Sequence, residues 1–380
     1  MTLRATATFW GSAAFVGYTY IGYPLLLWTA SRLRPKRVNR GPIEPTVSVV
    51  LAAHDEADNI GRKLDNLLEL DYPPDKLEII VVSDGSSDGT DDIVQRYVSE
   101  ADAPSVLLSR NEEAAGKAMA LNLGVARATG DVILFCDARQ PIDRGALRAL
   151  VRWFSDPQIG AVSGALQMGS DKGPGLYWAY EKLIREAESR FDSVVGATGA
   201  LYAIRRALWR DLPRGTLLDD VYTPLHIALQ GFRVTFEPDA RVYDEEASIE
   251  GEFARKARTL AGNFQLMNLL PELWSPRRNR LFPQLVSHKI MRLACPYALV
   301  ALYGANAYLV ATRAPGWPFY AVTLAGQTLV YGAALRATVG GGEASGRLER
   351  VSHAFVTLNA AAVEGLRRYL ASDLGWTSGR

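Results

Sequence analysis

The chain is poor in cysteine and lacks two common nucleotide-binding motifs. Its 380 residues include only Cys136 and Cys295, which indicate neither a disulfide framework nor a cysteine-rich metal site and agree with a reducing cytosol. No G-x-x-x-x-G-K-[ST] sequence occurs, which argues against a P-loop ATPase. The first predicted strand is followed by AAHDEADN rather than by G-x-G-x-x-G, which argues against a Rossmann-type dehydrogenase.

An excess of one charge is also missing. The 42 lysines and arginines nearly balance the 41 aspartates and glutamates. The net charge therefore argues neither for nor against nucleic acid, and we expect no nucleic-acid partner. The length is sufficient for two or three folding units with a sizeable core.

Charged residues are absent from three long segments, 5–31, 293–312 and 314–335. A helix needs roughly 20 apolar residues to cross a bilayer core, so each segment is predicted to span a membrane. The alternative for each segment is a buried helix of a soluble protein. The last two segments would form a hairpin that turns at Arg313–Trp317.

The residues that follow the first segment predict its orientation. The basic residues there, with no acidic residue among them, are Arg32, Arg34, Lys36, Arg37 and Arg40. This side is therefore predicted to be cytoplasmic, with the N-terminus outside. Segment 351–370 fits a helix lying in the interface as well as a short span. We favour the interface, because a span would carry the basic C-terminus outside.

These observations predict three regions in an integral protein of the plasma (bacterial inner) membrane. They are an N-terminal transmembrane helix with a basic juxtamembrane segment (1–43), a cytosolic domain (44–280), and C-terminal interfacial and transmembrane helices with a cytosolic tail (281–380).

The central region alternates between apolar runs and amphipathic stretches. The predicted strands are TVSVVLAAH, LEIIVVSD, VLLS and DVILFCDA, and the helices between them cover about 59–70, 90–100 and 116–128. Further along, IGAVSGALQM and RVTFEP read as strands, while YWAYEKLIREAESR and a segment ending at Gln230 read as helices. Continuous Val/Ile/Leu runs separated by helix-length segments indicate an α/β fold with a mostly parallel sheet flanked by helices on both faces.

Carboxylates follow several of these strands. Asp55 and Glu56 come after the first, Asp84 ends the second, and Asp137 follows the fourth. In parallel sheets ligands bind beyond the carboxyl ends of the strands. We therefore expect these side chains to share one crevice.

Two Gly-containing segments join strands to helices near this crevice. SDGSSDGT (83–90) leaves Asp84 pointing into the crevice, and GKAMALNLG (116–124) places Lys117 at a helix start that suits an anion. The alternatives are a turn and cap without a ligand for the first, and a solvated surface lysine for the second.

Two further segments carry clustered charges. LLDDVYTPLHIALQG (217–231) puts Asp219 and Asp220 at a helix start, where capping explains one acid readily and leaves the other for chemistry. EFARKARTLAGNFQ (252–265) places Arg255 and Arg258 within one helical turn. We favour phosphate binding for these arginines over a solvated basic face or a strip on anionic lipid.

Taken in order, these motifs resemble those of membrane-bound family 2 glycosyltransferases, the group that includes cellulose, hyaluronan and poly-N-acetylglucosamine synthases. The resemblance rests on AAHDEADNI, VVSDGSSDGT, GKAMALN, LFCDARQ, TGALYAIRR, LDD and RKARTLAGNFQ, and covers about residues 44–290. It implies a GT-A catalytic domain, with N-terminal and C-terminal transmembrane or interfacial helices, that uses a nucleotide sugar.

The resemblance also implies roles for individual residues. The nucleotide would be bound by His54, Glu56, Asp84, Lys117 and Asp137. Asp137 would also hold Mg²⁺ or Mn²⁺ on the diphosphate, and Asp220 would be the catalytic base. The diphosphate would contact Arg139, Arg255 and Arg258. Gly199, Asp219 and Gln265 would lie in the acceptor and donor-sugar region.

The sequence departs from the family pattern at three points. Arg139 replaces the second carboxylate of the D-x-D motif, Asp219 replaces a glutamate, and no tryptophan follows Arg258. The missing tryptophan puts processive polymerisation in doubt, although Trp274 or Trp376 would be a substitute. Our hypothesis is that Arg139 adds positive charge beside the diphosphate or locks Asp137 by a bidentate pair. The alternative is an arginine paired away from the site.

We predict inverting, metal-dependent transfer from a nucleotide sugar, UDP-linked by default, to a lipid-linked or polysaccharide acceptor in bacterial exopolysaccharide or envelope glycan synthesis. One alternative adds a single sugar to a polyprenyl or glycerolipid carrier, and another is an inactive membrane scaffold with this fold. The lipid bilayer is an expected partner. A wide export channel would need a second copy of the chain or an export partner.

Overall fold

The computed structural model describes residues 1–98, 104–168, 176–244, 249–340 and 346–372. The chain divides into two compact units. Unit 1 comprises residues 1–29, 247–264 and 283–373, and unit 2 comprises residues 30–246, 265–282 and 374–380.

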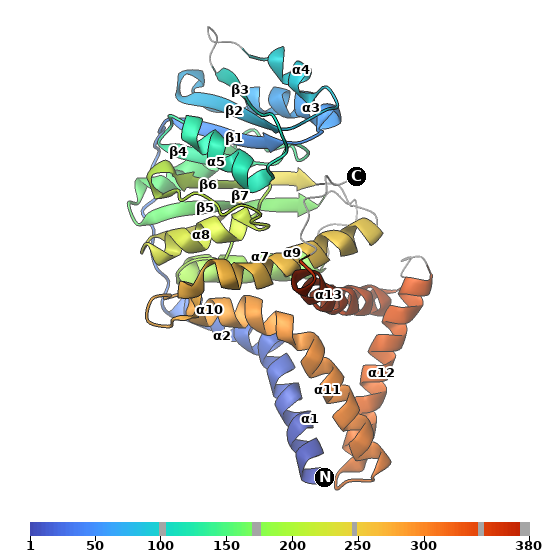
Figure 1. Cartoon of the computed structure of the whole chain (residues 1–380). Helices are drawn as coiled ribbons and strands as arrows, with labels where there is room; N and C mark the ends of the chain where they lie inside the picture. Colours follow the sequence, from blue (N-terminus) through green and yellow to red (C-terminus); the bar gives the residue numbers. More distant parts are fainter. Residues whose placement is uncertain (99–103, 169–175, 245–248, 341–345, 373–380) are drawn as a thin grey trace. The chain divides into compact units, whose positions relative to one another are not determined.

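Unit 2 is built on a seven-stranded sheet with the strand order β3-β2-β1-β4-β6-β5-β7 (Figure 1). The strands are β1 (Val47–Ala53), β2 (Leu77–Asp84), β3 (Ser105–Asn111), β4 (Val132–Cys136), β5 (Ile159–Met168), β6 (Leu201–Arg205) and β7 (Arg233–Asp244). The four strands β1 to β4 pair in parallel, whereas β6 is antiparallel to both β4 and β5. The predicted mostly parallel α/β sheet is therefore confirmed, with one reversed strand beside β4.

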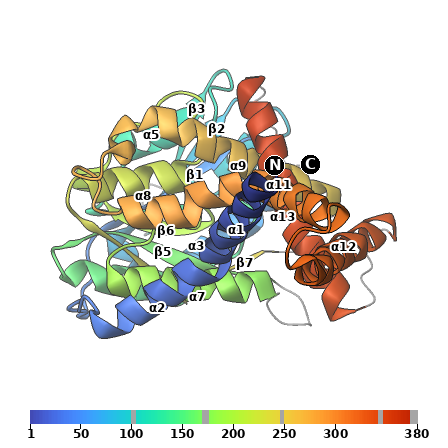
Figure 2. The same ribbon diagram turned by 90° about the horizontal axis from the view of Figure 1, so that it is seen from below.

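The helices of unit 2 cover both faces of the sheet. Those described are α3 (Ala57–Leu68), α4 (Thr90–Gln95), α5 (Lys117–Arg127), α6 (Ala146–Val151), α7 (Leu176–Phe191) and α8 (Asp219–Leu229). Figure 2 shows α5 and α8 on one side of the strands and α7 on the other. The predicted helices near 59–70, 116–128 and up to 230 match α3, α5 and α8 within a few residues. The helix predicted over 90–100 is shorter, ending at Gln95, and residues 99–103 lie outside the described part.

Alternation along β1 explains the two covered faces. Val49 and Leu51 belong to a core cluster that includes Ile60 and Leu64 of α3. Val50 points to the opposite face, where a Cβ on Gly124 of α5 would lie only 2.5 Å from its Cγ1 atom. Because successive strand residues point to opposite faces, one continuous apolar run fills two cores.

Unit 1 consists of helices. They are α1 (Thr2–Gly17), a π-helix (Tyr18–Gly22), most of α2 (Tyr23–Leu33) and of α9 (Ile249–Leu269), most of α10 (Phe282–Leu285), a second π-helix (Val286–Ile290), α11 (Met291–Ala311), α12 (Trp317–Val339) and α13 (Arg347–Leu370). Among the described residues, one helix is long and apolar enough to cross a membrane by length and composition, Phe282–Ala311. It contains most of the predicted span 293–312. The predicted spans 5–31 and 314–335 are helical but do not meet the same criterion.

Polar side chains join α11 to α12. The side-chain amide nitrogen of Asn306 lies 3.1 Å from both Thr323 Oγ1 and Gln327 Oε1. Tyr303 Oη lies 3.1 Å from Thr328 Oγ1. Aromatic rings gather where α1 meets α12: Trp10 stacks on Phe319 with 5.7 Å between ring centroids. The predicted turn at 313–317 lies between α11 and α12, as expected.

Helix α13 packs closely on the part of α9 that belongs to unit 1. A Cβ atom on Gly365 would lie 2.9 Å from Ala261 N and 3.0 Å from Ala257 O, so the two backbones touch at this position. Ala257 and Ala361 are fully buried. The segment 351–370 thus lies within one helix, with a face of small residues that packs against protein.

Candidate active site

The carboxyl ends of three neighbouring parallel strands form one edge of the sheet. β1 pairs with β2 on one side and with β4 on the other. His54 follows β1, Asp84 ends β2 and Asp137 follows β4. The parallel pairing therefore brings these predicted residues to the same edge, as expected from the sequence.

Asp84 is completely buried and surrounded by protein donors. Its Oδ1 accepts hydrogen bonds from Asn111 Nδ2 (2.7 Å) and Ala115 N (2.9 Å), and its Oδ2 accepts one from Gly116 N (2.7 Å). Asp84 therefore fixes the backbone just before α5. The prediction that it also binds the nucleotide base stays a prediction.

Gly85 makes this arrangement possible. Its φ is +67°, and a Cβ there would lie 2.6 Å from Ala114 N. A side chain would be strained by the backbone angle and would strike the neighbouring segment. The glycine in SDGSSDGT thus allows two loops to touch behind Asp84.

His54 and Glu56 lie where the loop after β1 contacts the loop after β2. His54 Nδ1 is 2.7 Å from the carbonyl oxygen of Asp84. Glu56 N donates to Thr90 Oγ1 (2.9 Å), and Glu56 Oε2 accepts from Asn59 Nδ2 (2.7 Å). Both side chains are half-buried. The segments that carry these two predicted nucleotide-binding residues are therefore joined to the neighbouring loop at this edge of the sheet.

Lys117, the first residue of α5, links two of the predicted acidic residues. Its Nζ lies 2.9 Å from Asp137 Oδ1 and 3.4 Å from Asp219 Oδ1. Burial alone would lower the pKa of this ammonium group, but attraction by Asp137, Asp219 and Asp220 outweighs burial and raises its pKa. Lys117 therefore stays protonated at neutral pH. This position excludes the alternative of a solvated surface lysine.

Asp219 is anchored on its other side by a tyrosine. Tyr202 of β6 is fully buried, and its hydroxyl donates to Asp219 Oδ2 at 3.1 Å. Burial, followed by the charges of Asp219 and Asp220, raises the pKa of Tyr202 well above its ordinary value. The tyrosine ring stacks on Phe135 of β4, 4.7 Å between centroids. Asp219, only 5% exposed, is therefore a fixed residue of the site.

Asp220 follows Asp219 at the start of α8 and is less buried. A Cβ on Gly199 would lie 3.1 Å from Asp220 Oδ2, so the carboxylate rests against the bare backbone of Gly199. The backbone of Asp220 accepts a hydrogen bond from Ala197 N at 2.7 Å. The structure therefore brings Gly199 and Asp220 together, and their assignment to a sugar-binding region stays a prediction.

The loop before α8 is held at both ends by side-chain amides. Asn122 of α5 pairs with Leu212 in both directions, donating to its carbonyl (3.0 Å) and accepting from its N–H (2.8 Å). Gln265 accepts from Leu217 N (3.0 Å) and donates to Gly215 O (2.8 Å). Gln265 thus positions the segment that leads to Asp219.

Arg139 does not lock Asp137. It is exposed and forms no ion pair or hydrogen bond with any residue in the described ranges, whereas Asp137 pairs with Lys117. The bidentate hypothesis is therefore wrong, because Lys117 reaches Asp137 from α5. The alternative of an arginine paired elsewhere is not seen in the described part of the chain either.

Arg255 and Arg258 lie on α9, in the part that belongs to unit 1. Their assignment to the diphosphate stays a prediction.

The turn after Asp137 is held by residues that the sequence analysis missed. Lys63 of α3 is 2% exposed and donates from Nζ to Gln140 O at 2.7 Å. Asn66 pairs with Ile142 in both directions, at 2.9 and 2.8 Å. The sequence contained a signal for Lys63, because this lysine lies on the apolar face of a predicted helix. Tyr202 and Asn122 carried no signal, because their partners are distant in sequence.

Asp137 is the carboxylate at the position expected for a ligand of a divalent cation. Among the described residues no group of three or more His, Cys, Asp or Glu side chains could hold a metal by itself. Metals of this kind are often held by one or two carboxylates together with substrate phosphate oxygens and water. Asp137, with 37% of its side chain exposed, fits that arrangement.

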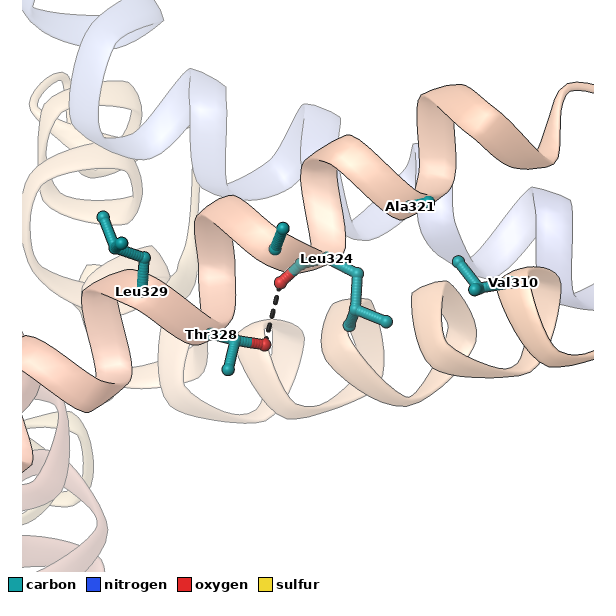
Figure 3. A pocket seen from close by; sticks show the side chains of 6 residues that line it. Val310, Ala321, Leu324, Thr328 and Leu329 are labelled. Atoms are coloured by element: carbon teal, nitrogen blue, oxygen red, sulfur yellow. Dashed lines mark hydrogen bonds between the residues drawn. The ribbon is translucent and has the colours of Figure 1, made fainter.

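A separate cavity lies in unit 1 between α11 and α12 (Figure 3). Its volume is about 480 Å³, and it is lined by Val310, Ala321, Leu324, Ala325, Thr328 and Leu329. The one hydroxyl, Thr328 Oγ1, donates to Leu324 O at 2.9 Å. This cavity has no charged lining residue, so it is not suited to a nucleotide diphosphate.

Comparisons with known proteins agree with this geometry. Residues 48–212 match the model of the family described as glycosyl transferase family 2. A probable glycosyltransferase, YdaM of Bacillus subtilis, is 28% identical over 254 residues, which cover 62% of this chain and 60% of that protein. The poly-beta-1,6-N-acetyl-D-glucosamine synthase of Staphylococcus aureus is 27% identical over 248 residues, covering 62% and 58%. The matches thus span less than two thirds of these relatives.

A solved structure matches over nearly the whole chain. It is the mannosyltransferase PcManGT from Pyrobaculum calidifontis in complex with GDP-Man and Mn²⁺. The TM-score is 0.75 and the identity 29%, and the match covers 95% of this chain and 98% of that one.

Proposed function

We propose that this chain, which is a family 2 glycosyltransferase with a GT-A fold, transfers a sugar from a nucleotide sugar to a membrane-associated acceptor with inversion at the anomeric carbon. The observation that carries the proposal is the cluster at the sheet edge. Lys117 contacts both Asp137 and Asp219, and Asp220 follows directly at the start of α8.

Asp220 is the proposed general base. It is more exposed than Asp219, and its carboxylate lies against Gly199, where the absent side chain leaves room beside it. A base positioned on the acceptor hydroxyl contributes roughly 10²–10⁴ in rate. Asp219 is bound by Tyr202 and Lys117 and serves to position the start of α8.

The diphosphate leaving group needs positive charge. Asp137 is the proposed ligand of Mg²⁺ or Mn²⁺, which neutralises the developing negative charge of the diphosphate when bound. The complex of PcManGT with GDP-Man and Mn²⁺ supports this proposal, given its match over 95% of this chain. Lys117 and the exposed Arg139 would supply further positive charge.

The proposed acceptor is a lipid-linked sugar or a growing polysaccharide. In the described part of the chain, the helix Phe282–Ala311 is long and apolar enough to cross a membrane. The hydrogen bonds between α11 and α12 are of the kind that join membrane helices. Exposed aromatic residues of unit 1, Trp10, Trp317 and Phe319, agree with anchoring at a membrane interface. The similarity to a polysaccharide synthase supports a role in bacterial exopolysaccharide synthesis.

A second candidate is transfer of a single mannose from GDP-mannose to a lipid carrier. It is favoured by one observation: the chain covers 98% of a mannosyltransferase but about 60% of its curated relatives. The absence of a tryptophan after Arg258 also agrees with transfer that stops after one sugar.

Membranes that contain the protein should be incubated with radiolabelled UDP-glucose, UDP-N-acetylglucosamine or GDP-mannose, with and without Mn²⁺. Products would then be separated by size and by extraction into organic solvent. Metal-dependent label in a large product supports polymerisation, and label in an extracted lipid supports the second candidate. No transfer from any donor to membrane material, with label only on free sugars, would contradict both.

We expect Asp220→Asn to reduce transfer by about 10²-fold or more, because the amide cannot accept the acceptor proton. Nucleotide binding, measured by calorimetry with Mn²⁺, should stay within about twofold of the unchanged protein. Asp211→Asn, on the exposed loop before α8, is the matched control and should retain transfer. Loss of binding and transfer together in the Asp220 variant would contradict the assignment.

A further inference from the structure

We propose that Lys117 competes with the divalent cation for Asp137 and thereby couples binding of the cation to binding of the donor diphosphate. The inference rests on the proposed function, since it takes Asp137 as the cation ligand. It assigns to Lys117 a coupling role in addition to nucleotide contact.

The ammonium group of Lys117 occupies the side of Asp137 that a cation would use. Lys117 Nζ lies 2.9 Å from Asp137 Oδ1, with 26% of the lysine side chain and 37% of the aspartate side chain exposed. A cation bound to Asp137 would therefore lie within a few ångströms of another positive charge. Two positive charges this close repel each other. A cation alone must overcome this repulsion or move the lysine.

Lys117 has a second partner besides Asp137. Asp219 Oδ1 lies 3.4 Å from Nζ, and Asp219 is held in place by Tyr202. The start of α5 is held by Asp84 through Ala115 N and Gly116 N. Because the backbone of α5 and the carboxylate of Asp219 are both fixed, only the flexible end of Lys117 needs to move away from Asp137.

The negative oxygens of a bound diphosphate would attract the ammonium group away from Asp137 and leave this carboxylate to the cation. Binding of the diphosphate then favours binding of the cation beyond any direct contact between the two. Linkage requires the reverse effect to be equal, so the cation also favours the diphosphate by way of Lys117.

In a variant without the ammonium group, we expect the affinity for Mn²⁺ alone and the affinity for the nucleotide to change in opposite directions. In Lys117→Met, Mn²⁺ alone should bind about fivefold to tenfold more tightly, because one repulsive charge is gone. UDP or GDP, whichever the unchanged protein binds, should bind more weakly. The ratio between Mn²⁺ affinities with and without the nucleotide should therefore fall by at least about tenfold. A lysine that only supports the fold would weaken both kinds of binding.

Electron paramagnetic resonance of free Mn²⁺ would measure the cation affinity, and calorimetry the nucleotide affinity. Lys117→Gln keeps a hydrogen-bond donor for Asp137 but removes the charge, so it serves if Lys117→Met does not fold. Lys117→Arg keeps the charge and should restore weak binding of Mn²⁺ alone. Lys76→Met, which removes a lysine paired with exposed Glu44, is the matched control and should change neither affinity.

The outcomes separate this inference from the proposed function. Weaker or unchanged binding of Mn²⁺ alone in both neutral variants would overturn the competition. Failure of the unchanged protein to bind a nucleotide with Mn²⁺ would overturn the proposed function itself.

Discussion

His226, in the last turn of α8, is a residue whose ionisation should affect stability. Burial, and then the nearby charge of Arg210, lowers the pKa of His226 below 6.5. Its Nδ1 lies 3.0 Å from Gln230 Nε2 and, in the neutral ring, can accept that hydrogen bond. The ring also stacks on Tyr222, 6.1 Å between centroids.

Because the folded protein holds this proton less tightly than the unfolded chain, stability should be full above about pH 6.5 and decrease as the pH falls below it. Thermal unfolding of the purified protein at pH 7.5 and 5.5 measures the difference. His226→Asn should reduce this difference, while His353→Asn on α13 serves as the control. An unchanged difference in the His226 variant would contradict the prediction.

At the same scale, the sequence predicted which acidic residues lie at one edge of the sheet but not what surrounds them. Asp84 ends one strand and Asp137 follows another, both recognisable from their apolar runs, so their place at the same edge followed from parallel pairing. The donors to Asp84 come from the loop between β3 and α5, whose path depends on Gly85 contacting Ala114. The pairing of Asp137 with Lys117 rather than Arg139 depends on the direction of side chains, which spacing alone does not give.

At the scale of elements, the contact between α13 and α9 depends on the lack of a side chain at Gly365. An alanine Cβ would lie 2.9 Å from Ala261 N and 3.0 Å from Ala257 O. Gly365→Ala should therefore lower stability by about 1–3 kcal/mol, since backbone atoms cannot yield as side chains do.

The matched control is Gly332→Ala on α12, where an added Cβ meets nothing within 4 Å. There the alanine should be neutral or stabilise the helix by about 0.5–1 kcal/mol. Thermal unfolding followed by circular dichroism would measure both variants. Equal effects at the two positions would show that close packing at Gly365 does not matter.

The positions of strands and helices along the chain were predicted better than the directions in which the strands run in the sheet. The long apolar runs of β1, β2 and β4 identified buried strands, and the glycine after α8 marked its end. Nothing in LYAIR indicated that β6 runs antiparallel to β4, because both faces of a strand are buried in either direction. That reversal depends on the long connection through β5 and α7.

At the scale of the whole molecule, the proposed membrane orientation can be tested with single cysteines. Both native cysteines are buried. In the proposed orientation the turn between α11 and α12 faces outside, and the catalytic unit faces the cytoplasm. A membrane-impermeant maleimide should therefore label Pro315→Cys in intact cells, and should label Glu69→Cys only after permeabilisation. Both positions are exposed.

The reverse pattern would contradict the orientation, and recovery of the protein in the soluble fraction would contradict the membrane assignment. Hydropathy alone supports one of the three predicted spans. Uncharged segments identify where helices lie. However, tyrosine, threonine and glycine reduce the mean hydropathy of segment 5–31. The absence of charge is therefore a weaker criterion for a membrane span than hydropathy.

Asn66 and Asn122 hold the backbones of Ile142 and Leu212 through paired donor and acceptor bonds. Because these bonds are made to backbone atoms, they do not depend on the side chains at positions 142 and 212. Arg214, which is exposed in the stretch 213–216 beside the proposed catalytic acids, can therefore be varied while these supports stay in place. Gly215 should be kept, because its φ is +78°. Position 214 is thus a target for libraries that alter the choice of sugar.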